Sequence, residues 1–124
     1  MIEKDFSDVF QALRMILNEA ASQMQVKQDD PGLVYLIAPY PDIKGRELYF
    51  GGAQIKKNYV SFHLMPVYMH PELLDGISPQ LLKRMQGKSC FNFTKVDETL
   101  FAELSQLTQQ SLNWFKQNAR TFEY

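Results

Sequence analysis

The sequence predicts an α+β fold in which two long amphipathic helices pack on one face of an antiparallel sheet. Three observations lead to this prediction. Apolar residues recur at helical spacing near both ends of the chain, an alternating strand pattern lies in the middle, and tight-turn signals separate the first strands. The expected order is helix, three strands, helix, strand, helix. The length of 124 residues favours one domain spanning residues 1–124.

Two long helices are expected over residues 5–24 and 97–118. In each, apolar side chains recur every three or four residues and form one stripe, which is typical of a helix that packs on a core. Asp97 is placed to cap the second helix. Ser78 and Pro79 predict the start of a shorter helix, because serine caps free amides and proline suits the first turn. Gly87 is expected as its C-terminal cap.

The strands are recognised by alternation and by β-branched or aromatic residues. They are expected over residues 33–38, 46–55, 58–68 and 88–94. Gly51 and Gly52 interrupt the second strand, and glycine inside a strand indicates a bulge or a close approach by another group. Residues 25–32 are polar and end in Asp-Asp-Pro-Gly, so we expect a solvated connection there.

The strand over residues 58–68 has two different sides. Val60, Phe62 and Leu64 form the side expected to face the helices, because successive strand residues point to opposite faces. The other face would carry aromatic and polar groups, as small-molecule sites tend to do. Its expected ligand-binding residues are Tyr49, Tyr59, Ser61, His63, Met65, Cys90 and Asn92, with Tyr35 as a neighbour. The alternative is that short helices and loops cover this face as a second small core.

The composition limits the possible functions. The net charge of −1 gives no general basic field, so nucleic acid is not an expected partner. No apolar run approaches the roughly 20 residues of a membrane span, and no signal segment is evident, so we expect a cytoplasmic protein without a membrane partner. The single cysteine, Cys90, cannot form an intramolecular disulfide.

Catalytic motifs are absent from the sequence. It contains no Walker loop, dinucleotide-binding glycine pattern, Gly-x-Ser-x-Gly elbow or His-Glu-x-x-His. His63 and Cys90 could take part in catalysis only if folding placed them beside a carboxylate. A zinc site would need His63, His70 and Cys90 to meet in space, and nothing in their spacing predicts this. Whether the protein is an enzyme stays uncertain, and a non-enzymatic function is favoured.

The central part of the chain resembles the YdhG-like family of small bacterial domains of unknown function. The resemblance depends on Tyr-Val-Ser-Phe-His-Leu-Met-Pro-Val-Tyr at residues 59–68, Pro-Glu-Leu-Leu at 71–74, Ile-Ser-Pro at 77–79 and Met-Gln-Gly-Lys-Ser-Cys-Phe-Asn-Phe at 85–93. The last run is the most specific. The family implies a compact α+β domain with an antiparallel sheet, and at least one member is described as a frataxin-like iron chaperone.

Two functions are therefore expected. The first is a non-enzymatic binding domain that holds a small ligand or a protein partner on the aromatic face, with no cofactor. The alternative, implied by the resemblance, is a frataxin-like iron chaperone that binds iron through acidic residues of the first helix and the following strand. The matching acidic residues are Glu3, Asp5, Asp8, Glu19, Asp29 and Asp30, interrupted by Lys4 and Arg14. The oligomeric state is left open.

Overall fold

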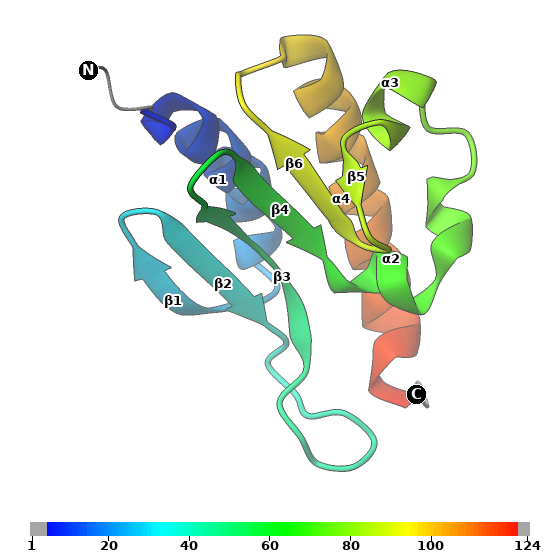
Figure 1. Cartoon of the computed structure of the whole chain (residues 1–124). Helices are drawn as coiled ribbons and strands as arrows, with labels where there is room; N and C mark the ends of the chain where they lie inside the picture. The colour runs from blue at the N-terminus through cyan, green and yellow to red at the C-terminus, as the bar shows by residue number, and fades with distance from the viewer. Residues whose placement is uncertain (1–4, 122–124) are drawn as a thin grey trace.

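The computed structural model describes residues 5–121 and contains one antiparallel sheet of six strands. The strands lie in the order β1-β2-β3-β4-β6-β5 (Figure 1). Their bounds are β1 (Gln25–Asp30), β2 (Leu33–Ile37), β3 (Tyr49–Ile55), β4 (Val60–Leu64), β5 (Met85–Gln86) and β6 (Cys90–Phe93). The predicted α+β class is confirmed.

Two long helices, α1 (Ser7–Ala21) and α4 (Glu98–Asn118), cover one face of the sheet (Figure 1). Asp97 caps α4 as expected, since its carboxylate accepts the Leu100 N–H at 3.0 Å. The shorter helices are α2 (Met65–Met69), η1 (Pro71–Leu74), α3 (Pro79–Leu82) and η2 (Ala119–Thr121). α2, η1 and α3 all contact α4. Within residues 5–121, no helix is long and apolar enough to cross a bilayer.

The core lies between the two long helices and the sheet. Val60, Phe62 and Leu64 are fully buried there, as their alternation predicts. Phe50 from β3 packs edge-on against Phe115 from α4, with ring centroids 5.2 Å apart. Because burying an aromatic or aliphatic side chain stabilises by roughly 1.5–3 kcal/mol, this layer holds α4 on the sheet.

The expected solvated connection over residues 25–32 is wrong in part, because most of it forms the edge strand β1. All six residues of β1 are exposed, so the strand has no buried side to give it an alternating pattern. It pairs with β2 through the backbone, and the chain turns at residues 31–32. Lys27 forms an ion pair with Glu47, and Asp29 forms one with Arg14. These charges suit an edge strand, since they disfavour pairing with another chain.

The strand expected over residues 58–68 is shorter than predicted. It ends at Leu64, and Met65 begins α2. Pro66 explains the change, because proline has no N–H to donate to a strand ladder and is well suited to the first turn of a helix. Gly87 also differs from expectation. α3 ends at Leu82, and Gly87, with φ of 79°, lies in the turn between β5 and β6.

The glycine pair in β3 behaves as predicted. The pairing of β2 with β3 shifts register beside it, at Leu36 and Ile37. A Cβ atom on Gly52 would lie 2.4 Å from the Val34 carbonyl oxygen, and one on Gly51 would lie 2.6 Å from the His63 carbonyl oxygen. Only glycine allows the neighbouring strands to approach this closely.

Candidate functional site

The face of the sheet opposite α1 and α4 carries the polar and aromatic side chains of β2, β3, β4 and β6. The register places Gly52, His63 and Cys90 in one row across three strands. Ser61 and Asn92 lie side by side in the next row. Figure 1 shows both long helices behind the sheet, on the side away from the viewer. The side chains of this face are half-buried, so they are not the second core considered as the alternative.

Three rings stand together at the centre of this face. The Tyr35 and Tyr49 ring centroids are 4.4 Å apart, and those of Tyr49 and His63 are 5.1 Å apart with an interplanar angle of 10°. Gly52 pairs with Tyr35 on one side and with His63 on the other. Because Gly52 has no side chain, Tyr49 can lie across it, with its hydroxyl 3.3 Å from the position a Cβ would take.

A pocket of about 150 Å³ opens beside these rings. We call it the Tyr49 pocket. It is lined by Leu33, Val34, Tyr35, Tyr49, Gly52, Ala53, Gln54, Ser61 and His63. None of these side chains carries a formal charge when the histidine is neutral. A cavity of this size accommodates about one six-membered ring.

His63 is held by a neighbour that the sequence did not indicate. Its Nε2 lies 2.6 Å from Ser89 Oγ, and Ser89 is buried just before β6. Burial lowers the pKa of His63, because the charged imidazolium is less well solvated inside the protein. The ring is therefore neutral at physiological pH and offers hydrogen bonds without charge.

Cys90 is a poor nucleophile in this setting. Burial raises the pKa of its thiol, and this effect outweighs hydrogen bonds with Ser61 and Ser89 that lower it. Burial also raises the pKa of Tyr49. Because the reactive form of cysteine is the thiolate, the raised pKa makes the Cys90 thiol less reactive than an exposed one. Within residues 5–121, none of the hydrogen bonds and ion pairs joins His63 or Cys90 to a carboxylate.

The loop that precedes Tyr49 is braced by one carboxylate. Asp42 accepts the N–H groups of Lys44 and Arg46, each at 2.8 Å, and also binds the Arg46 side chain. These contacts lower the pKa of Asp42, with the backbone hydrogen bond from Arg46 as the largest cause. These contacts close the turn at residues 42–46, in the loop that leads to β3.

The structure brings some of the predicted residues together and separates others. Tyr49, Ser61 and His63 line the Tyr49 pocket. Cys90 and Asn92 share the same face on β6, outside the pocket lining.

Two predicted residues lie elsewhere. Tyr59 is in the turn before β4, where its carbonyl accepts the Lys56 N–H at 2.8 Å. Met65, the first residue of α2, lines a neighbouring hollow with Asp42, Glu47 and Tyr49, so it lies on the other side of the Tyr49 side chain from the Tyr49 pocket.

Several residues of the site were missed, among them Leu33, Gln54 and Ser89. Leu33 and Gln54 line the pocket because β2, β3 and β4 pair in this register, which one sequence does not reveal. Ser89 was missed because the strand expected over residues 88–94 would place it on the face opposite to Cys90, whereas β6 begins only at Cys90 and Ser89 lies in the turn before it. Alternation from Cys90 and Asn92 could have suggested only which face of β6 is open.

The acidic residues of the iron hypothesis are not gathered. Asp5 accepts the Ser7 N–H, Asp29 pairs with Arg14, and Asp30 accepts a hydrogen bond from Gln28. Glu3 lies outside the described residues. Within residues 5–121, no group of three or more His, Cys, Asp or Glu side chains is placed to hold a metal ion. The donor set that iron prefers is therefore not assembled in this part of the chain.

Comparisons with protein-family models, curated proteins and solved structures found no match. The resemblance to the YdhG-like family stays a prediction from the residues of the central segment.

Proposed function

We propose that this protein is a non-enzymatic binding domain whose Tyr49 pocket holds a small, uncharged ligand with a planar ring. The observation that carries the proposal is the set of three rings, Tyr35, Tyr49 and His63, beside a pocket of about 150 Å³. Sites for small molecules are typically concave and largely apolar, with a few convergent polar groups. The pocket has this character.

The chemistry of the lining indicates the kind of ligand. Leu33 and the Tyr35 ring offer apolar surface for a flat molecule. Tyr49, Gln54 and Ser61 offer a phenol, an amide and a hydroxyl that can donate or accept hydrogen bonds. A charged ligand would lose its hydration here without gaining an opposite charge, so a neutral molecule is favoured.

The proposal is tested by titrating single-ring neutral compounds, such as phenol and benzamide, while backbone NMR shifts are followed. We expect saturable shifts at Tyr35, Gly52 and Ser61, and weaker or no binding of benzoate, which adds a charge to the same ring. Tyr49→Ala removes the central ring, and we expect it to weaken binding by about tenfold, since aromatic contacts contribute roughly 0.5–1.5 kcal/mol beyond their buried area.

Tyr68→Ala is the matched control. Tyr68 is an exposed tyrosine on α2 and does not line the pocket, so its removal should leave the affinity unchanged. Ser61→Ala gives a second, smaller change within the pocket. Binding that is indifferent to both Tyr49→Ala and Ser61→Ala would overturn the proposal, as would the absence of saturable binding by every neutral ring compound.

A further inference from the structure

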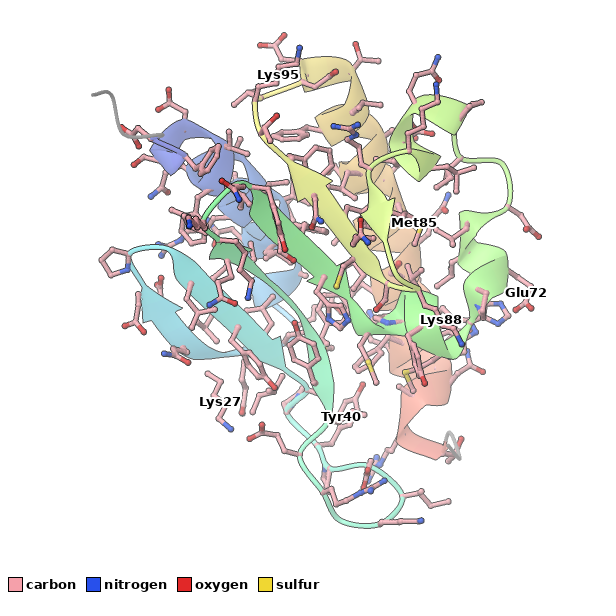
Figure 2. All side chains as sticks on the ribbon, viewed as in Figure 1. Lys27, Tyr40, Glu72, Met85, Lys88 and Lys95 are labelled. Carbon is pink, nitrogen blue, oxygen red and sulfur yellow. The ribbon has the colours of Figure 1, made fainter. Side chains whose placement is uncertain are left out.

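A second pocket, of about 260 Å³, lies where α3, the end of β6 and the start of α4 meet. We call it the basic pocket. It is lined by Gln80, Lys83, Arg84, Phe93, Thr94, Lys95, Asp97 and Leu100. Figure 2 shows Lys95 on the turn that joins β6 to α4. The basic pocket shares no lining residue with the Tyr49 pocket, so any ligand here is bound independently.

The charges around this pocket are unbalanced. Lys83, Arg84 and Lys95 bring three positive charges and Asp97 brings one negative charge, which leaves a net charge of +2. The chain as a whole carries −1, so the positive charge is local. Within residues 5–121, none of the four ion pairs involves these three cations. Such a group of like charges is stabilised by an anion placed among them.

The single carboxylate is already engaged. Asp97 accepts the Leu100 N–H at 3.0 Å and so caps α4. It faces the backbone of its own helix and forms no ion pair with the three cations. α4 extends over 21 residues, and the positive end of its dipole lies at this pocket. The dipole adds to the field of the side chains, which carry most of the charge.

Part of the lining of the basic pocket is apolar. Leu100 is half-buried and offers this surface, whereas Phe93 is 2% exposed and offers almost none. An inorganic anion alone would cover the cations and leave the apolar part of the lining uncovered. A ligand with an anionic group and a small organic body would use both parts of the pocket.

We propose that the basic pocket binds a phosphate monoester of a small organic molecule. A phosphate monoester carries a charge of about −1.5 to −2 at pH 7, which matches the +2 of the lining. The guanidinium of Arg84 can donate two parallel hydrogen bonds to phosphate oxygens, and Lys83 and Lys95 add point charges. A carboxylate would neutralise only half of this charge, so the phosphate is preferred.

The test uses phenyl phosphate as the probe, followed by backbone NMR shifts and by calorimetry on the full chain. We expect saturable shifts at residues 83–84 and 94–100, and none at Gly52 or Ser61. Phenol and benzoate are the comparison compounds. They share the ring but carry no charge or one charge, and both should bind this pocket more weakly than phenyl phosphate. Affinity should also fall below pH 6, where the phosphate dianion takes up a proton and becomes a monoanion.

Two variants distinguish the pocket from general attraction to positive charge. Arg84→Gln should weaken phenyl phosphate binding by about tenfold, because it removes a bidentate, charge-assisted contact. Lys116→Gln, which removes an equal charge from an exposed position on α4 away from the pocket, should leave the affinity unchanged.

Equal weakening by both variants would overturn the proposal, because binding would then depend on total charge alone. It would also be overturned if the largest shifts appeared outside residues 80–100, or if phenyl phosphate did not saturate the protein. These outcomes leave the Tyr49 pocket proposal standing, since that proposal is judged by shifts at Tyr35, Gly52 and Ser61 and by different variants.

Discussion

Gly52→Ala should destabilise the protein, although alanine normally suits a strand better than glycine does. The added Cβ would lie 2.4 Å from the Val34 carbonyl oxygen and 3.4 Å from the Tyr35 Cα, and both are backbone atoms. Close carbon–oxygen contacts between strands settle at about 3.3–3.6 Å, so β2 and β3 must separate by roughly 1 Å. Because the contacted atoms belong to the backbone, no side-chain rotation can relieve this contact.

The size of the effect follows from that displacement. Separating the strands by about 1 Å stretches the hydrogen bonds beside the Tyr35–Gly52 pair beyond their working range, at about 1 kcal/mol for each of two or three bonds. The alanine also reduces the freedom of the unfolded chain, which returns about 0.4–1 kcal/mol. We therefore expect a net loss of about 2 kcal/mol in the free energy of unfolding. For a chain of this length the melting temperature should fall by roughly 8 °C.

Urea unfolding followed by the fluorescence of the single tryptophan, Trp114, measures this change. Gly45→Ala is the control. Gly45 has φ of 78° and nothing within 4 Å of an added Cβ, so only backbone strain is expected, about 1 kcal/mol. A Gly52→Ala protein as stable as the original, or more stable, would show that β2 and β3 do not approach as closely as described.

Three further predictions address other parts of the molecule. His63→Gln should reduce the pH dependence of stability. Burial lowers the pKa of His63 below its ordinary value of about 6.5, so the unfolded chain binds more protons than the folded protein as the pH falls from 6.5. The original protein therefore loses stability in this pH range, and the variant does not. Urea unfolding at pH 7.5 and 5 measures the difference. An equal change in unfolding free energy between these pH values for both proteins would contradict the prediction. Asp97→Asn keeps a capping oxygen but removes a negative charge from the basic pocket. Calorimetry should therefore show that phenyl phosphate binds about two- to fivefold tighter, while the unfolding free energy changes by less than about 1 kcal/mol. Unchanged or weaker binding would refute the charge argument. Ser78→Ala loses the cap to Leu81 and the bond to Glu103, and urea unfolding should show a loss of about 1–2 kcal/mol, whereas no loss would mean that α3 does not depend on this cap.

Local patterns predicted the buried side of β4 and the starts of α3 and α4. The alternation of Val60, Phe62 and Leu64 identified the buried side of β4, because side-chain direction in a strand depends only on neighbouring residues. Asp97 and Ser78 were recognised as caps for the same reason, since a cap acts on amides within one helical turn.

The candidate site was predicted in part. Ser61 and His63 share a face by simple alternation, so their proximity follows from the sequence. Tyr49 joins them only because β3 pairs with β4 in one register and because Gly52 leaves room for its ring. Met65 was misplaced because an alternating pattern continues through it, although Pro66 marks the end of the strand.

What the sequence determined by itself is therefore local: the α+β class, the buried side of β4, the caps and the importance of Gly51 and Gly52. Tertiary structure alone decided that residues 25–30 form a strand, because an exposed edge strand exists only through its backbone pairing with β2. Tertiary structure also forms the basic pocket, because the packing of α3 beside α4 brings Arg84 and Lys95 close to each other. Register and packing join residues that are distant in sequence, and a pattern limited to neighbouring residues contains no information about them.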